Sequence, residues 1–406
     1  MRVCLFSLIF LLIFFSELKS NDNISLLLKN GNVKEASNLL QEKYNNKTLS
    51  FDEFLQFYYL KEFLGTEKTI NDFSYWAKKS ANQYAYSYAL FRSPAVIGES
   101  GLKNKHQLQY INELIKDDNC PAFVKSSAIY DLAIHYFYKH DYKRMNENYA
   151  QIKAIEDWLM TGPFYNISGS GMDKIYEPEK YAKKDKTFDT EFFGKVFWFD
   201  PASIKKEGWI TFTYNFPVGT GKIFYAQTFI NSPQEQDLIL ELGFGGSIKI
   251  FLNDYPIFTE YEERNTDFGN KFIKVRFNKG YNRLLVKIGT ENLSDPYFCI
   301  RLLNEDLTLN TSCRIVKEPQ NYTGQNHLDV TIIDSPLETF LKNQTEKAPE
   351  NVYNYITLAR YYTRMGYFDE AIDNIEKAYK LEPDNPLVLI NKLYIYNKAG
   401  NKVQAS

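Results

Sequence analysis

Short segments between residues 208 and 303 alternate apolar and polar side chains, and this pattern constrains the fold more than any other feature. In "KGYNRLLVKIG" (279–289), a turn precedes a run in which Leu284, Val286 and Ile288 share one side. This alternation predicts a strand with one face buried and the other exposed. Similar runs separated by turn residues predict an antiparallel β-sandwich. The predicted strands are 208–214, 221–230, 237–244, 246–254, 271–277, 282–289 and 296–303.

Turn and loop signals divide these strands. Turns are expected at Gly245-Gly246, Asn253-Asp254 and Lys279-Gly280, and the charged stretch 259–267 reads as a solvated loop. We place the sandwich at 158–315. A polar connector with one further candidate strand, "LDVTIID", follows at 316–345.

Helical patterns flank the sandwich on both sides. Residues 21–157 contain amphipathic runs with small residues at helix-crossing positions, which predict an array of helical hairpins. The fold class expected for the whole chain is therefore multidomain, with α-helical hairpins flanking an antiparallel β-sandwich.

The segment 346–406 carries the most specific motif. "NVYNYITLARYYTRMGYFDEAIDNIEKAYKLEPDN" resembles the 34-residue tetratricopeptide repeat, a pair of antiparallel helices. Small residues are needed where the two helices cross closely. The residues that match the repeat are Tyr355, Leu358, Ala359, Tyr362, Gly366, Ala371, Ala378 and Pro383. The N-terminal array resembles degenerate copies of the same repeat.

A second repeat is in register from Pro386, with Leu389, Leu393, Tyr396 and Gly400. Its second helix would only begin at Ala405. We therefore expect the chain to be a fragment or the product of a shortened gene, the alternative being a short fraying tail.

The strand pair "GGSIKIFLNDYPIF" and "KFIKVRFNKGYNRLLVKIG" resembles the galactose-binding-like jelly-roll family. The matching positions are Ser247, Lys249, Leu252, Asn253, Lys279, Gly280, Asn282, Leu285 and Lys287. Phe251 and Asp254 depart from the Trp and Gly that are usual there. The resemblance implies a jelly-roll scaffold and a weak glycan-binding module. Tyr255, Tyr261 and Tyr281 are the candidate glycan contacts, by ring stacking.

The opening of the sandwich resembles that of large secreted bacterial proteins in which a transglutaminase-like peptidase region can follow. The matching residues are Trp158, Gly162, Pro163, Phe164, Gly171 and Glu179. The resemblance implies an alternative role for the chain, as the non-catalytic N-terminal part of such a protein.

The N-terminus predicts secretion. Met1-Arg2 precedes an apolar run from Val3 to Phe15, typical of a signal peptide cleaved near Ser20, with an uncleaved anchor as the alternative. No other run is apolar enough to span a membrane, so an extracytoplasmic protein is expected. There, Cys299 and Cys313 either form a disulfide or stay as two thiols, and Cys120 is left over.

Catalytic signatures are absent from the sequence. The four histidines are scattered, and there is no zinc-protease, nucleophile-elbow or phosphate-loop motif. We predict no catalytic residue, no metal and no cofactor. A net charge of -2 without a basic stripe predicts no nucleic-acid partner.

The repeats predict protein binding. Stacked helical hairpins offer a concave surface to peptides or domains, and here the first helices are rich in tyrosine, with Arg360 and Arg364 nearby. The expected function is that of a secreted, non-enzymatic interaction protein with the sandwich as a spacer.

Overall fold

A computed structural model describes residues 24–66, 70, 72–91, 105–202, 207–217, 219–293 and 295–400. The predicted signal peptide at 1–20 lies outside these residues. The chain divides into two compact units, one made of residues 1–110 and 337–406 and the other of residues 111–336. No described helix is long and apolar enough to cross a membrane.

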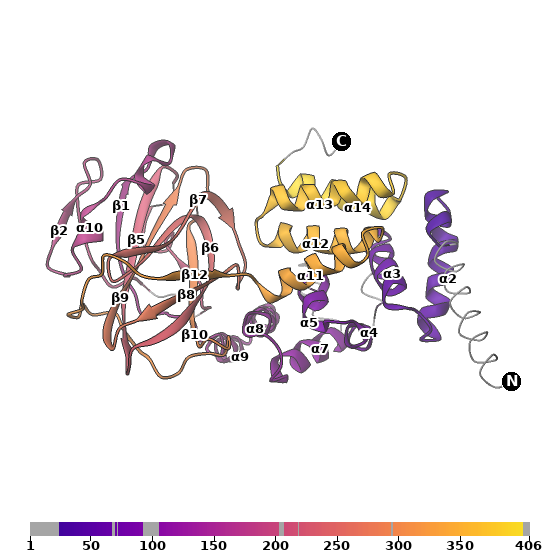
Figure 1. Ribbon diagram of the computed structural model, residues 1–406, viewed down its shortest axis with the longest axis horizontal. Coiled ribbons are helices and arrows are strands. Elements are labelled where there is room, and N and C mark those ends of the chain that lie inside the picture. The colour runs from indigo at the N-terminus through magenta and orange to yellow at the C-terminus, as the bar shows by residue number, and fades with distance from the viewer. Residues whose placement is uncertain are drawn as a thin grey trace. The chain divides into compact units, whose positions relative to one another are not determined.

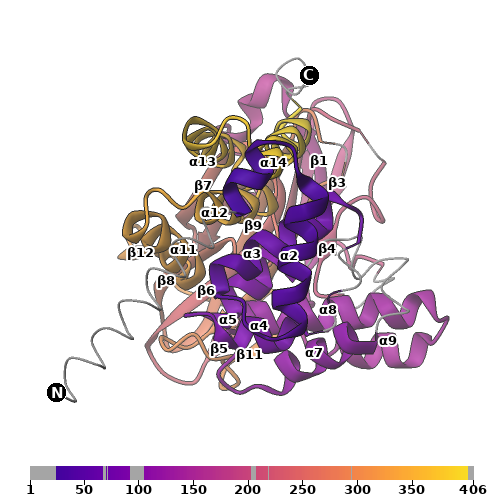
Figure 2. The same ribbon diagram turned by 90° about the vertical axis from the view of Figure 1, so that its right-hand side faces the viewer.

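The first unit is helical and is assembled from both ends of the chain. Figure 2 views it with α2 and α3 toward the reader. Its helices are α2 (Val33–Asn45), α3 (Phe51–Phe63), α4 (Phe73–Lys79), α5 (Gln83–Tyr86), the π-helical turn η2 (Ser87–Phe91), α11 (Pro336–Lys347), α12 (Val352–Arg364), α13 (Phe368–Leu381) and α14 (Pro386–Lys398). Helix α7 (Lys105–Lys116) spans the boundary between the units.

The second unit contains the sandwich and two helices that sequence patterns assign elsewhere. Helices α8 (Ala122–Tyr138) and α9 (Tyr142–Tyr149) belong to this unit, whereas the sequence placed 21–157 in one helical array. The reason lies in α8, which buries Phe123 against Phe272 of the sheet, with ring centres 5.8 Å apart. The predicted connector also contains structure, since β12 (Val330–Ile333) and the start of α11 lie within 316–345.

The strands form a ten-stranded antiparallel sheet that folds over itself into two layers (Figure 1). One layer runs β12–β8–β6–β10–β4, and the other runs β1–β5–β9–β6–β7, with β11 beside β1 on the edge of β5. The bounds are β1 (Leu159–Tyr165), β4 (Ile210–Thr211), β5 (Lys222–Ser232), β6 (Gln236–Leu252), β7 (Tyr255–Asn265), β8 (Lys271–Phe277), β9 (Gly280–Thr290), β10 (Tyr297–Leu303) and β11 (Arg314–Val316).

Strand β6 is shared by the two layers. Its first half pairs with β8 and β10, and its second half pairs with β7 and β9. The turn predicted at Gly245-Gly246 is therefore wrong, because these glycines lie inside β6, a single strand of 17 residues. The glycines serve a different purpose, because a Cβ on Gly245 would lie 2.3 Å from the Tyr297 ring. Glycine thus permits close approach where the strand passes from one layer to the other.

The hairpin between β6 and β7 forms as the sequence predicts, at Asn253-Asp254. Both residues have positive φ, 51° and 71°, as a tight hairpin turn requires. The stretch after it is not a loop, however. Strand β7 includes most of 259–267, because its backbone pairs with the second half of β6, and of its charged residues only Glu262 is exposed.

Apolar side chains from both layers meet in one core. Leu240, Val275, Val286 and Ile300 come from four different strands and are all buried in it. A second apolar cluster lies on the other side of β5 and β9, around Trp198. It is covered by the segment between β1 and β5, which holds the 3-10 helix η4 (Ile167–Met172), α10 (Glu177–Lys180), β2 (Thr187–Asp189) and β3 (Lys195–Phe197).

Strand β9 is consequently buried on both faces. The prediction of one exposed face is wrong, since Arg283 and Lys287 are each only 1% exposed. Arg283 donates to Pro178 O at 2.6 Å and to Gln227 Oε1 at 3.0 Å, and Lys287 lies 2.9 Å from Glu179 Oε1. These contacts fasten the covering segment to the sheet, and burial lowers the pKa of Lys287.

Candidate functional site

The tetratricopeptide signature residues line the contact between α12 and α13. Ala359, Ala371 and Ala378 are fully buried, and Leu358 and Tyr362 are nearly so. Gly366 has a φ of +74° in the turn between the helices. Tyr355 is half-buried, and Pro383 is exposed in the next turn. The residues act mainly in packing, as the motif predicts.

The structure continues the repeat in phase into α14. The Asn351 side chain caps α12 by accepting from Tyr353 N at 3.0 Å, and Asn385 caps α14 by accepting from Leu387 N at 2.9 Å. The left-handed Gly366 likewise has a counterpart in Gly400, with a φ of +80°. Both pairs are one 34-residue repeat apart, so α14 occupies the position of a first repeat helix.

The arginines expected near a binding groove are instead used inside the helical unit. Arg360 places Nη2 2.5 Å from Glu62 Oε2 on α3, donates through Nε to Asn391 Oδ1 at 2.6 Å, and lies over the Tyr59 ring. The Arg364 guanidinium lies 3.7 Å from the centre of the Tyr88 ring. Helix α3 and the η2 turn thus occupy the face of α12 on which both arginines lie.

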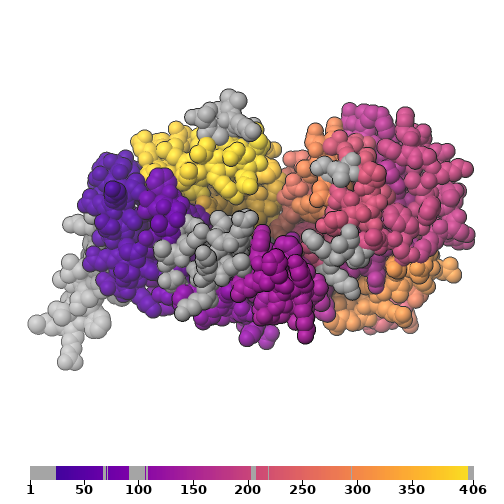
Figure 3. Space-filling model, turned by 180° about the vertical axis from the view of Figure 1, so that it is seen from behind, coloured from indigo at the N-terminus to yellow at the C-terminus, as the bar shows by residue number. Residues whose placement is uncertain are grey.

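One face of α14 remains exposed and apolar. Leu389, Leu393 and Tyr394 are each 44% exposed and Ile390 is 38% exposed. Ile356 and Ala359, one repeat earlier on α12, are both 0% exposed. In Figure 3 the surface of α13 and α14 appears in yellow beside the indigo N-terminal helices of the same unit. We call Leu389, Ile390, Leu393 and Tyr394 the α14 stripe.

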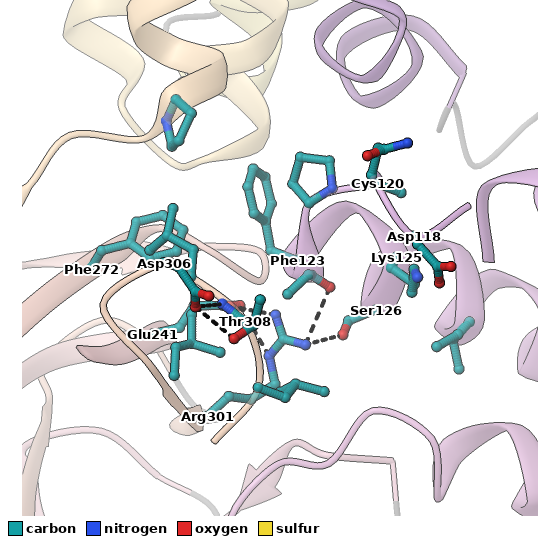
Figure 4. Close-up of a pocket in the computed structure, with 18 of the residues that line it drawn as sticks. Asp118, Cys120, Phe123, Lys125, Ser126, Glu241, Phe272, Arg301, Asp306 and Thr308 are labelled. Carbon is teal, nitrogen blue, oxygen red and sulfur yellow. Dashed lines mark hydrogen bonds and ion pairs between the residues drawn. The ribbon is translucent and has the colours of Figure 1, made fainter. Parts of the chain in front are cut away.

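A pocket of about 400 Å³ lies within the sandwich unit. It is lined by α8, the outer ends of β6, β8 and β10, and the loop after β10 (Figure 4). The volume falls in the range of small-molecule sites, roughly 300–1,000 Å³. Its rim includes Cys120, and burial raises the pKa of this thiol to about 12. A thiol with so high a pKa is protonated at neutral pH and is a poor nucleophile.

A buried ion pair forms the floor of this pocket. Arg301 and Glu241 have side chains only 1% and 2% exposed, and the guanidinium binds both carboxylate oxygens. The remaining Arg301 donors reach Ala122 O at 3.2 Å and Ser126 Oγ on α8. Burial raises the pKa of Glu241 even though Arg301 opposes this effect. Four hydrogen bonds hold the guanidinium to Glu241, Ala122 and Ser126, so its role here is to fasten α8 to the sheet.

The buried histidine of α8, His135, predicts a pH-dependent stability for this unit. His135 is 4% exposed, and burial, together with the charges of Lys139 and Arg144, lowers its pKa. The unfolded chain, with an ordinary histidine pKa near 6.5, therefore binds a proton first as the pH falls. We expect the free energy of unfolding to decrease between about pH 7 and pH 5.

Urea unfolding at several pH values would measure this slope. The His135→Gln variant should have a flatter dependence than the wild-type protein, whereas substitution of the exposed His140 should leave it unchanged. Equal slopes for the His135 variant and the wild-type protein would contradict the assignment.

The three cysteines among the described residues, Cys120, Cys299 and Cys313, are free. Cys299 lies in β10 on the side away from the main core, while Cys313 packs against that core. Cys313 directly precedes β11, which pairs with β5, whereas β10 pairs with β4 and β6, so the two cysteines do not lie on paired strands.

The three tyrosines proposed for glycan contact do not form one surface. Tyr255 is half-buried against the core at one end of β7, and Tyr261 lies six residues further along, about 20 Å away in an extended strand. Tyr261 donates to Asp173 Oδ1 at 2.7 Å. Tyr281 is half-buried on β9, opposite Asn231 of β5. Among the described residues, no group of three or more His, Cys, Asp or Glu side chains could hold a metal ion.

The comparisons with known proteins agree with the repeat. The tetratricopeptide repeat model matches residues 352–385, which contain α12 and α13. No curated protein matches the chain. A crystal structure of a β-glucosidase from Kluyveromyces marxianus in complex with glucose aligns with 56% of this chain at 15% identity and a TM-score of 0.23. The aligned part is 24% of that enzyme, and the likeness is too distant to support an argument about fold or function.

Proposed function

We propose that this chain is a secreted, non-catalytic interaction protein that binds a protein partner through the α14 stripe. The matched repeat supports protein interaction, since repeats of this kind bury their apolar faces against neighbouring helices. The observation that carries the proposal is the contrast between α14 and α12. Ile390 and Leu393 are exposed, whereas their counterparts one repeat earlier, Ile356 and Ala359, are fully buried.

The repeat register defines the chemistry of the partner. In the first repeat, α13 covers α12 with Ala371 and Ala378, whose small side chains allow close approach of the helices. A partner for α14 should therefore present an amphipathic helix with small residues on its apolar face. Such helix-in-groove recognition uses anchors three and four residues apart, the spacing found in the α14 stripe.

A peptide test follows from this geometry. A labelled peptide with the sequence of residues 367–382, which contains α13, should bind the full chain and raise its fluorescence anisotropy. The Leu389→Glu/Leu393→Glu double variant should bind at least about tenfold more weakly, because each charge replaces a buried leucine contact. The Leu26→Glu variant, which alters an exposed leucine elsewhere in the unit, is the control.

The outcomes separate cleanly. Binding lost in the double variant and kept in the control supports the stripe as the docking surface, provided that circular dichroism shows unchanged helix content. Absence of peptide binding to the wild-type chain would contradict the proposal, as would equal binding to both variants.

Three finer assignments accompany this proposal. Secretion rests on the apolar run Val3–Phe15. The galactose-binding-like assignment and a weak glycan-binding role rest on the motifs in β6 and β9. The alternative, the front part of a transglutaminase-like peptidase, rests on the residues near Trp158. The distance of about 20 Å between Tyr255 and Tyr261 gives the glycan role less support than protein binding.

A further inference from the structure

The segment covering the outer face of β5 and β9 exposes an unusual set of apolar side chains. At the tip of the β2–β3 hairpin, Phe192 is 69% exposed and Phe193 is 42% exposed. The exposed Ile167 and Ile175 belong to the same covering segment. The hairpin and α10 lie at the left-hand edge of this unit in Figure 1.

We propose that the Phe192-Phe193 tip inserts into the interfacial region of a lipid bilayer. Interfacial regions of membranes favour aromatic side chains at headgroup depth, and adjacent exposed phenylalanines at a loop tip suit that environment. A soluble surface gains nothing from them, since each leaves apolar area in water.

The tip satisfies four of its own backbone N–H groups, which lowers the cost of entry into an apolar medium. Thr190 N donates to Gly194 O at 3.1 Å, and Phe192 N donates to Thr190 O at 2.8 Å. Phe193 N donates to the Thr190 hydroxyl at 2.8 Å, and Glu191 N donates to the Asp189 carboxylate at 2.9 Å. Four consecutive amides therefore need no water.

The rigidity and charge of the hairpin fit the same role. The Phe192 ring stacks on Tyr165 with centres 4.8 Å apart, and Glu191 is neutralised by Lys174 at 2.8 Å. Residues 180–197 contain five lysines and three acidic residues. Of these lysines, Lys180, Lys183 and Lys195 are exposed. The three acidic residues are exposed as well, but the excess of lysine suits attraction to anionic headgroups.

Vesicle co-sedimentation tests the proposal with the full chain. The wild-type protein should pellet with vesicles of phosphatidylcholine and phosphatidylglycerol, and more weakly with phosphatidylcholine alone. The Phe192→Ser/Phe193→Ser variant should lose roughly tenfold or more in partition coefficient. The Tyr142→Ser variant, which alters a residue 52% exposed on α9, should pellet like the wild-type protein.

The vesicle experiment has results that support the proposal and results that overturn it. Loss confined to the phenylalanine variant, with an unchanged thermal unfolding curve, supports membrane contact. The Lys183→Gln/Lys195→Gln variant should bind more weakly to the vesicles that contain phosphatidylglycerol and equally well to those of phosphatidylcholine alone. This result would support attraction to the anionic headgroups. Wild-type protein that pellets with neither vesicle would overturn the proposal, as would equal losses in the Tyr142 control. The proposal would also be overturned if the Phe192→Ser/Phe193→Ser variant changed the oligomeric state of the protein while the wild-type protein did not bind lipid.

Discussion

Replacing Arg301 with alanine should lower the free energy of unfolding of the sandwich unit by about 3–5 kcal/mol. The change leaves the Glu241 carboxylate buried without its cation, and it removes the donors to Ala122 O and Ser126 Oγ that hold α8. Urea unfolding followed by tryptophan fluorescence would measure it, because Trp158, Trp198 and Trp209 report from this unit.

A double variant provides the control for that prediction. Glu241→Leu/Arg301→Met replaces both charges with apolar groups of similar size, which is often close to neutral for a buried pair. The double variant should therefore be more stable than Arg301→Ala alone. If the two unfold at the same urea concentration, the loss comes from packing and not from an uncompensated charge.

Replacing Arg360 with alanine should destabilise the helical unit by roughly 3 kcal/mol. The substitution strands Glu62 on α3 and removes the hydrogen bond to Asn391 on α14, so three helices lose a shared contact. Circular dichroism during urea unfolding is the suitable measurement, since it follows the helices directly.

The control for this prediction is Lys377→Ala, which alters an exposed residue of α13 and should unfold like the wild-type protein. An Arg360→Ala variant with wild-type stability would mean that the arginine is available to a partner, as the sequence alone suggests. The experiment thus decides between an internal and an external role for the same side chain.

Local patterns predicted the elements whose own alternation or repeat motif is strong. Strand β8 has the predicted bounds, 271–277, and the α12–α13 pair follows the repeat motif and is confirmed by the family match. In both cases the apolar residues recur with the period of the strand or helix, so the sequence indicates which residues are buried. The Asn253-Asp254 hairpin belongs to this group as well.

Features set by distant neighbours could not be predicted in the same way. The alternation in β9 does not show that Arg283 and Lys287 are buried, because their cover comes from a segment about 100 residues earlier. Nor does the sequence of α12 indicate that Glu62 pairs with Arg360, since the partner lies near the other end of the chain. The glycines of β6 gave a turn signal, although their role is close approach to Tyr297.

The candidate site likewise has a part that local patterns predicted and a part that depends on distant neighbours. The repeat register located α14, and Leu389 and Leu393 were recognised in it as repeat residues. Their exposure depends on which helices pack nearby, which periodicity does not reveal. The Phe192-Phe193 tip had only one sequence signal, two adjacent phenylalanines before a glycine, and that signal gains meaning from the hydrogen bonds around Thr190.

The sharing of β6 between the two layers has a consequence for how the unit folds. The first half of β6 is the middle strand of one layer, and its second half joins β9 to β7 in the other, so neither layer is complete until β6 is placed. Its partners range from β7, directly after it in the chain, to β10, about 50 residues later. Such distant pairings slow the search for the native topology, so the sandwich should form late and in one cooperative step.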